Sequence, residues 1–220
     1  RRSGVDRRRS CRCTVAAADR ARCVPVCWRR FLQQHPPARR APLRASREAG
    51  LEILEVSQPI ICAINGDAVG LGATLALFCD ISVISETAKF GDTHVKVGLV
   101  AGDGGAVVWP LLIGPARAKE FLMRGRLVNG AEARQLNLVN HDAPADQVMA
   151  KSMEIARELA ALPPLAVRWT KLSVNKWLKQ QLNLVLDASI AYEMLSMNSK
   201  DHHEAAMAFI EKRKPEFKGI

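Results

Sequence analysis

The chain has 220 residues, of which 48% are apolar and 25% are charged, and its formal net charge is +10. This composition excludes a disordered or fibrous protein, and the sequence contains no apolar run long enough for a membrane-spanning helix. Residues 1–50 hold 14 of the 32 basic and 3 of the 22 acidic residues, so the positive charge lies in this segment. Because the rest of the chain is almost neutral, we expect neither a specific nucleic-acid partner nor a membrane.

Residues 1–45 follow no helical or strand pattern. They contain arginine but no lysine, and four cysteines: Cys11, Cys13, Cys23 and Cys27. The spacing of these cysteines, with His35 nearby, permits a zinc site, but it fits no common zinc module. A disordered basic arm is a second interpretation, and a misread frame is a third. No secretory signal pattern is present, so we expect a cytoplasmic protein.

Regular patterns begin near residue 46. The run Ile60-Ile61-Cys62-Ala63-Ile64 is continuously apolar and rich in β-branched residues, which is typical of a strand buried on both faces. A turn and the loop Gly70-Leu71-Gly72 follow it, and a second glycine-rich loop covers residues 99–105. In chain order, the predicted elements of this part are helix 47–56, strand 60–64, helix 73–78, strand 81–84, an extended piece at 90–91, and helices 106–112 and 116–124.

The C-terminal third is predicted to be helical. Apolar residues recur there at helical spacing, and Pro163-Pro164 ends the first helix. Asp201 and Glu204 resemble a capping box that opens the last helix. The predicted helices are 148–159, 166–179, 182–197 and 201–212. Strands alternating with helices, followed by helices alone, predict an α/β core over residues 46–145 and a helical region over residues 146–220.

Gly70-Leu71-Gly72 lies between a predicted strand and a predicted helix, where two ligand sites are possible. A dinucleotide fingerprint needs a third glycine at position 75, but this chain has Leu75. The same geometry also lets backbone N–H groups at a helix start stabilise an oxyanion. We therefore favour an oxyanion site over a dinucleotide site.

His94 and Asp103 form the second candidate cluster, with Asp92 two residues before the histidine. An imidazole beside a carboxylate can transfer protons near neutral pH. The alternative is that His94 is a structural histidine and that Asp103 caps a helix. The spacing alone favours this structural alternative.

Residues 46–220 resemble the crotonase, or enoyl-CoA hydratase/isomerase, superfamily, whereas residues 1–45 do not match it. The resemblance lies in QPIICAINGDAVGLGATLALFCD, FGDTHVKVGLVAGDGG, GPARAKEFLMRGRLVNGAEARQLNLVN and AFIEKRKPEFKG. It implies a spiral core of ββα turns whose N-terminal part is not recognisable here, and a C-terminal helical trimerisation region. It further implies an acyl-CoA thioester substrate, a homotrimer or hexamer, and neither a separate cofactor nor a metal ion.

The same resemblance assigns candidate site residues. The backbone N–H of Leu71, between Gly70 and Gly72, matches one donor of an oxyanion hole that stabilises a thioester enolate. Lys214 and Phe217 loosely match residues that contact CoA bound to a neighbouring subunit. These assignments are expectations drawn from the family.

The chain departs from the family at both catalytic glutamates, whose positions are Thr74 and His94 here. Reduced or altered activity is therefore expected. The pair of His94 and Asp103, followed by Val107-Val108-Trp109-Pro110, resembles the branch that hydrolyses carbon–carbon bonds of β-diketones. A second histidine of that branch, near the glycine loop, has no counterpart here. A non-catalytic, acyl-CoA-binding member is the third possibility.

The family's first oxyanion loop is also missing from the written sequence. Its expected place is near Trp28, where the chain reads Val26-Cys27-Trp28-Arg29-Arg30. If both arginines use CGN codons, the neighbouring frame encodes Phe or Ser, then Ala, Gly, Gly and Asp, which matches the missing loop. The segment 1–45 is thus either a frame error or a divergent N-terminus.

Overall fold

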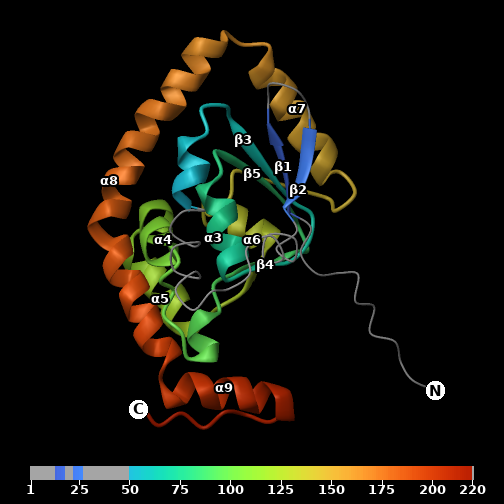
Figure 1. Ribbon diagram of the computed structural model, residues 1–220. Helices are drawn as coiled ribbons and strands as arrows, with labels where there is room; N and C mark the ends of the chain where they lie inside the picture. The colour runs from blue at the N-terminus through green and yellow to red at the C-terminus, as the bar shows by residue number, and fades with distance from the viewer. Residues whose placement is uncertain (1–12, 18–21, 27–49, 220) are drawn as a thin grey trace, which may run out of the picture.

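The computed structural model of the chain describes residues 13–17, 22–26 and 50–219 (Figure 1). Residues 50–55 are helical. The strands are β1 (Cys13–Ala17), β2 (Arg22–Val26), β3 (Ile60–Ile64), β4 (Ala68–Val69), β5 (Ile81–Ser85), β6 (Lys89–Gly91), β7 (Val128–Asn129) and β8 (His141–Ala143). The helices are α3 (Leu71–Phe78), the 3-10 turn η1 (His94–Val97), α4 (Gly105–Ile113), α5 (Pro115–Arg124), α6 (Gly130–Gln135), α7 (Val148–Ala160), α8 (Pro164–Met197) and α9 (Lys200–Glu211).

Two small sheets form the centre of the α/β core. The larger sheet has the strand order β2-β1-β3-β5-β8, and β3, β5 and β8 run parallel. The smaller sheet has the order β4-β6-β7, with β4 parallel to β6. One strand of each sheet and then a helix recur along the chain, as β3-β4-α3 and again as β5-β6-η1-α4. This recurrence is the ββα turn that the resemblance implied.

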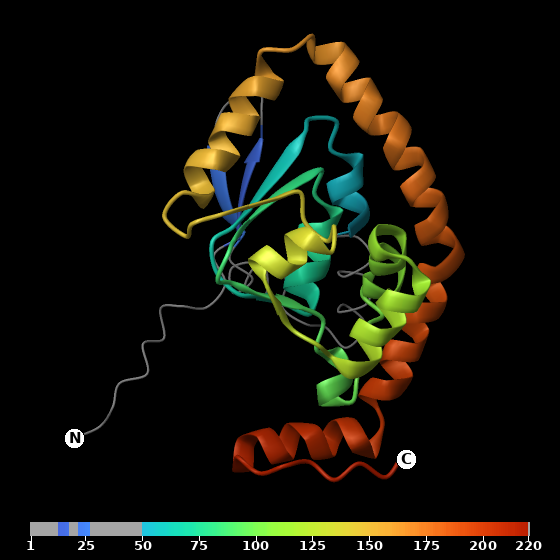
Figure 2. The same ribbon diagram turned by 180° about the vertical axis from the view of Figure 1, so that it is seen from behind.

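β3 is fully buried, as its continuous apolar run predicted. Ile61 and Ala63 face a cluster that includes Val148 and Ile155 of α7. Cys62 and Ile64 face the opposite way, into the main core with α3, α4 and α5. Burial of both faces therefore explains why this strand does not alternate apolar with polar residues. In Figure 2, α7 lies beside this sheet, on the side away from α4 and α5.

α8 is one continuous helix of 34 residues, where the sequence analysis predicted separate helices over 166–179 and 182–197. That prediction was wrong because the junction, Gln180-Gln181, contains neither proline nor glycine to end a helix. In Figures 1 and 2, α8 runs from the top of the molecule down to α9 at its lower end. Among the residues that the structure describes, no helix is both long and apolar enough to cross a membrane.

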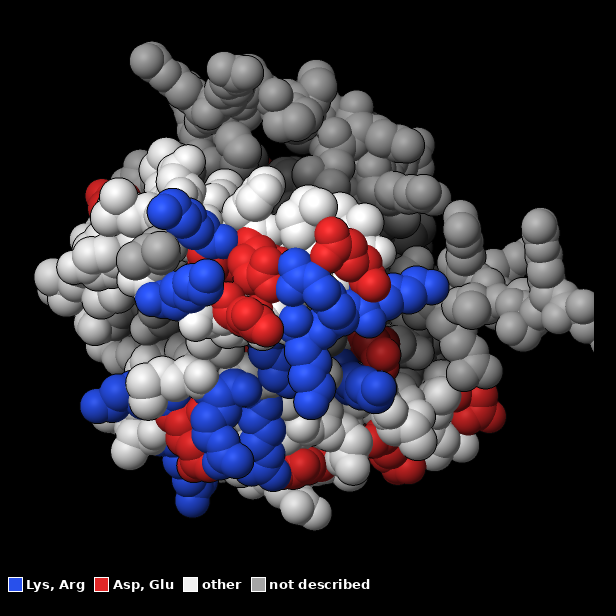
Figure 3. All heavy atoms as spheres, turned by 90° about the horizontal axis from the view of Figure 1, so that it is seen from below, with Lys and Arg blue, Asp and Glu red and all other residues white. Residues whose placement is uncertain are grey.

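α9 begins differently from the predicted capping box. Its N-cap is Ser199, whose hydroxyl accepts a hydrogen bond from the His202 N–H at 3.1 Å. The Asp201 carboxylate instead accepts hydrogen bonds from the N–H groups of Lys218 and Gly219, at 2.7 and 2.8 Å. The predicted capping box does not form, because the C-terminal tail folds back along α9 and its N–H groups bind the Asp201 carboxylate. Figure 3 views this end of the molecule and shows positive and negative side chains interleaved on it.

β1 and β2 lie within the segment 1–45, for which no regular element was predicted. They form an antiparallel pair, and β1 also pairs with β3 from Cys13 opposite Ile64 to Ala17 opposite Ile60. Backbone pairing to the edge of β3 requires no sequence period, so the pattern gave no signal. The side chains that would permit a zinc site, and the sequence near Trp28, lie outside the part of the chain that the structure describes.

Lys171 of α8 contacts residues at the start of β3 and of β5. Its ammonium group lies 2.6 Å from Asp80 Oδ2 and donates a hydrogen bond to the Gln58 carbonyl at 2.9 Å. The same Asp80 oxygen accepts the Ile60 N–H at 2.7 Å. Because the Lys171 side chain is only 6% exposed, this ion pair is largely removed from water. It holds α8 against the sheet.

We expect Lys171→Met to lower the free energy of unfolding by about 3–5 kcal/mol, because it leaves the Asp80 carboxylate without its cation. Urea denaturation measures this change. Lys176→Met, at an exposed position of the same helix, is the matched control and should change stability by less than about 0.5 kcal/mol. Equal effects of the two variants would contradict the proposed role of the ion pair.

Candidate active site

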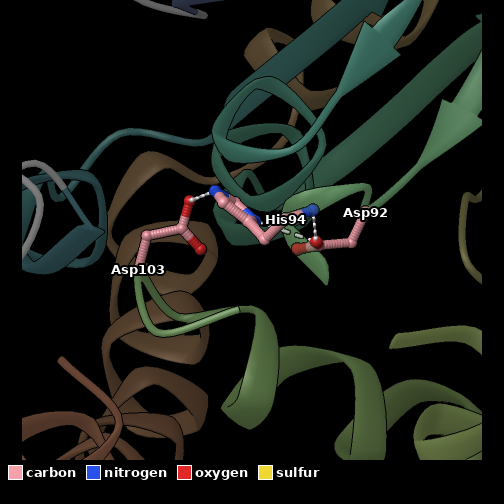
Figure 4. Close-up of side chains that lie close together, drawn as sticks. All are labelled: Asp92, His94 and Asp103. Atoms are coloured by element: carbon pink, nitrogen blue, oxygen red, sulfur yellow. Dashed lines mark hydrogen bonds and ion pairs between the residues drawn. The ribbon is translucent and has the colours of Figure 1, made fainter. Parts of the chain in front are cut away.

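Four polar side chains from different elements meet where the two ββα turns come together. Thr74 lies on α3, Asp92 directly follows β6, His94 opens η1, and Asp103 precedes α4. Asp92, His94 and Asp103 are drawn in Figure 4. β4 and β6 are parallel, with Val69 paired to Gly91, so the residues that follow these strands lie at the same sheet edge. The Gly70 N–H donates to the Gly91 carbonyl at 2.9 Å and extends this pairing.

Asp92 orients the His94 imidazole. Its Oδ1 lies 2.8 Å from His94 Nδ1 and also accepts the backbone N–H of His94 at 3.0 Å. Asp92 is 1% exposed, so this contact is made away from water. The double contact fixes the ring and leaves Nε2 pointing toward Asp103 (Figure 4).

Asp103 lies at the other nitrogen of the ring. The distance from His94 Nε2 to Asp103 Oδ2 is 3.6 Å. Asp103 Oδ1 accepts the Thr74 hydroxyl at 3.1 Å and the Gly105 N–H at 3.4 Å. Oδ2 is buried and has no hydrogen-bond partner among the described residues. The structure therefore brings His94 and Asp103 together, as their interpretation as a proton-transfer pair required.

The helix-capping interpretation of Asp103 was wrong. The N-cap of helix α4 is Gly104, with φ of 119°, although Asp103 Oδ1 accepts the N–H of Gly105, the first residue of the helix, at 3.4 Å. A Cβ atom on Gly104 would lie 2.8 Å from the Phe78 ring, so glycine is required for both conformation and space. Asp103 consequently lies one residue before the cap, with one of its oxygens free of hydrogen bonds.

The loop Gly70-Leu71-Gly72 lies beside the imidazole. Gly70 has φ of 59°, and a Cβ atom placed on it would lie 3.4 Å from His94 Cε1. Gly70 caps α3, and its carbonyl accepts the N–H groups of Ala73 and Thr74. Within the described part of the chain, the N–H groups of Leu71 and Gly72 have no backbone acceptor. Two free N–H groups at a helix start are suited to binding an anionic oxygen.

Burial alone would lower the pKa of His94, but its carboxylate neighbours reverse that effect. The hydrogen bond to Asp92 and the negative charges of Asp103, Asp92 and Glu193 together raise the pKa of His94 to about 9. The imidazole is therefore protonated at neutral pH and lies as a cation between two carboxylates. This imidazolium balances negative charge that would otherwise be buried without compensation.

Burial raises the pKa of two acids near the imidazole, Asp103 and Glu193. For Asp103, the charge of His94 only partly offsets this effect. Glu193 of α8 was not predicted as a site residue. Burial and the negative charges of Asp103 and Asp92 raise the pKa of Glu193 to about 7.

A metal site would need the three side chains to converge. Ligand atoms of Asp92, His94 and Asp103 lie within 4.8 Å of one another, a spacing that an ion can bridge. However, each carboxylate faces a different ring nitrogen (Figure 4), whereas the ligands of a protein metal site surround one point. The geometry therefore favours a triad in which the His94 imidazole is hydrogen-bonded to Asp92 and lies within ion-pair distance of Asp103.

Lys214 and Phe217, the expected CoA-contacting residues, lie in the tail that follows α9. Both are exposed. The tail is held to α9 by hydrogen bonds from the Glu216 N–H to Glu204 and from the Lys218 N–H to Asp201. Among the described residues, no hydrogen bond or ion pair joins either residue to Asp92, His94 or Asp103 of the same chain. Their use by a neighbouring subunit stays a prediction.

Comparison with known proteins identifies the family to which this chain is similar. A profile of the enoyl-CoA hydratase/isomerase family matches residues 32–220. The match therefore begins before residue 46, where the expected resemblance started. YngF of Bacillus subtilis, which carries the name of this family, is 42% identical over 166 residues, or 74% of this chain and 63% of that protein. The mitochondrial methylglutaconyl-CoA hydratase of Rattus norvegicus is 36% identical over 76% of this chain and 55% of its own length. The chain thus spans less than two thirds of these curated relatives.

Solved structures of similar proteins confirm the predicted crotonase fold. An enoyl-CoA hydratase from Mycobacterium avium subsp. paratuberculosis superposes with a TM-score of 0.76 at 27% identity, covering 80% of this chain and 72% of that one. An enoyl-CoA hydratase/isomerase from Mycobacterium paratuberculosis gives a TM-score of 0.72 at 36% identity, covering 75% and 66%.

We expect NMR to show that His94 titrates at about pH 9, and that Asp92→Asn lowers this value by removing the charged hydrogen-bond acceptor. The variant His94→Gln assigns the signal, and His203→Gln, at an exposed position, is its control.

The raised pKa of His94 also stabilises the fold. This contribution is complete below the unfolded value of about 6.5 and is lost as the pH rises through about 9. A His94 signal that titrates as in the unfolded chain would contradict the triad.

Proposed function

This chain belongs to the enoyl-CoA hydratase/isomerase family, and we propose that it binds an acyl-CoA thioester and stabilises the enolate formed from it. The Leu71 N–H, at the start of α3, donates one hydrogen bond to the thioester oxygen. Its lack of a backbone acceptor among the described residues supports this role. A preorganised donor of this kind is worth about 10²–10³-fold in rate.

The observation that carries the proposal is the position of the acid–imidazole–acid triad against this helix start. A Cβ atom placed on Gly70, next to the Leu71 donor, would lie only 3.4 Å from the His94 ring, so the ring borders this loop. The protonated imidazole serves as the general acid toward the enolate carbon. The free oxygen of Asp103, Oδ2, accepts a proton from substrate or water. His94 and Asp103 thus stand in for carboxylates that the chain lacks.

Ordinary hydration of an enoyl group is not the reaction that this arrangement favours. Thr74 occupies one glutamate position, is fully buried and spends its hydroxyl hydrogen on Asp103. A threonine hydroxyl does not ionise near neutral pH, so Thr74 cannot replace a carboxylate as an acid or a base. The two glutamate positions therefore hold one proton donor, His94, and no base, and the base of this site is Asp103, at a different position.

Hydrolytic cleavage of a carbon–carbon bond in a β-diketone is the second candidate. In this reaction a water molecule adds to one ketone carbonyl, the bond to the central carbon breaks, and the resulting enolate takes up a proton. Asp103 would accept the proton of the water and His94 would return one to the enolate. The direct approach of His94 to Asp103, at 3.6 Å, is the specific observation in its favour. Acyl-CoA binding without turnover is the remaining alternative.

Assembly into a homotrimer or hexamer is part of the proposal. α9 exposes 84% of Phe209 and 70% of Ile210, and α8 exposes 71% of Leu195. Large apolar side chains exposed together favour burial against another subunit. Such an assembly would place the tail with Lys214 and Phe217 near a neighbouring site.

We expect hydration of crotonyl-CoA to be far below the usual enzymatic range of about 1–10³ per second, because each missing acid–base group typically costs about 10²–10⁴-fold. The absorbance of the conjugated thioester measures this rate. Turnover within the usual range would show that our assignment of Thr74 and His94 to the glutamate positions is wrong.

A panel of acyl-CoA thioesters and β-diketones separates the candidates. On whichever substrate is turned over, we expect His94→Gln and Asp103→Asn each to lower kcat/KM by about 10²–10⁴-fold, with His203→Gln unchanged. Cleavage of a diketone but no acyl-CoA would favour the second candidate. Tight binding of acyl-CoA with no turnover of either class would favour the binding protein.

A further inference from the structure

Glu193 is a charged residue at a position where α8 should be apolar. The inward face of this helix carries Leu182, Leu186 and Ile190, which are 1%, 5% and 7% exposed. Glu193 continues that series by one further step of three residues, and it is half-buried. A carboxylate on the core-facing stripe of a helix is unfavourable unless it interacts with a specific partner.

The segment that Glu193 packs against is the one that carries Asp103. A Cβ atom on Gly102 would lie 2.4 Å from the Ser189 carbonyl oxygen and 2.7 Å from Glu193 Oε2. Only glycine therefore fits at position 102 while α8 stays in place. The Ser189 hydroxyl also donates to the Gly102 carbonyl at 2.9 Å. These contacts hold the Glu193 carboxylate beside the residue that immediately precedes Asp103.

No ordinary structural partner explains this carboxylate. Within the described part of the chain, neither an ion pair nor a hydrogen bond involves the Glu193 side chain. The charged groups that act on it are Asp103, before α4, and His94 and Asp92, from η1 and the end of β6. Its charge is therefore felt chiefly by the triad.

We propose that Glu193 is a positioning residue of this site, which acts through Asp103 and determines how strongly His94 holds its proton. When Glu193 is ionised, its negative charge favours the His94 imidazolium and opposes ionisation of Asp103. When Glu193 is protonated, both effects disappear. Because burial and the two aspartates raise the pKa of Glu193 to about 7, this change occurs near neutral pH. The proposal rests on the proposed function only where activity is measured.

NMR titration of His94 in Glu193→Gln tests the electrostatic part without any substrate. Glutamine keeps the shape of the side chain and removes its charge. We expect the midpoint of the His94 titration to fall by roughly half a pH unit, because one favourable negative charge is lost. Glu158→Gln, at an exposed position of α7, is the matched control and should leave the midpoint unchanged. An unchanged midpoint in Glu193→Gln would overturn the proposal.

The pH dependence of kcat/KM tests the functional part. On any substrate that is turned over, we expect an inflection near pH 7 in the wild type and in Glu158→Gln, and its loss in Glu193→Gln. An inflection that persists in a folded Glu193→Gln would contradict the proposal. If Glu193→Gln does not fold, Glu193→Asp serves instead, because the shortened side chain withdraws the charge and should shift both readings in the same direction. If no substrate is found, the proposed function fails, and the NMR titration still decides the role of Glu193.

Discussion

The burial of two carboxylates on either side of one imidazole is the constraint on which the rest of this site depends. Asp92 and Asp103 are 1% and 3% exposed, so each would be costly as an isolated anion. The proton on His94 offsets part of that cost, and the Thr74 hydroxyl and the Gly105 N–H offset more. His94 is therefore protonated because the carboxylates on both sides of it favour the cation. This proton is then available for transfer.

The fold supplies this arrangement through its ββα turns. Parallel strands β4 and β6 end at the same edge, so the chain leaves β4 into the Gly70 loop and leaves β6 into Asp92 at adjacent places. The first turn thus contributes backbone donors, and the second contributes the imidazole and both aspartates. α8 closes the site from outside the turns by packing Ser189 and Glu193 on Gly102. A site of this kind is shared between elements that are far apart in sequence.

Much of this could be predicted from the sequence, for identifiable reasons. The strand Ile60–Ile64 and the helices after the glycine loops follow directly from apolar runs and from breakers. The approach of His94 to Asp103 was predicted only as one of two interpretations, because the two residues are nine positions apart and this spacing also fits a structural role. Glu193 was not predicted, because Asp103 lies 90 positions earlier and only the packing of α8 on Gly102 brings the two acids near each other. One signal was available, namely an acid on the apolar stripe of a helix.

The charge of His94 is coupled to the three acids around it. With a glutamate at this position, Asp92, Asp103 and Glu193 would leave four carboxylates in one largely buried cluster, and like charges at this spacing cannot all ionise. With histidine, the cluster contains one cation that contacts both aspartates. The acids and the imidazole therefore form one electrostatic unit. The charge of residue 94 determines how many of the neighbouring carboxyl groups can be ionised. A glutamate in place of His94 would therefore require at least one carboxyl group of the cluster to stay protonated, unless Asp92, Asp103 or Glu193 changed as well.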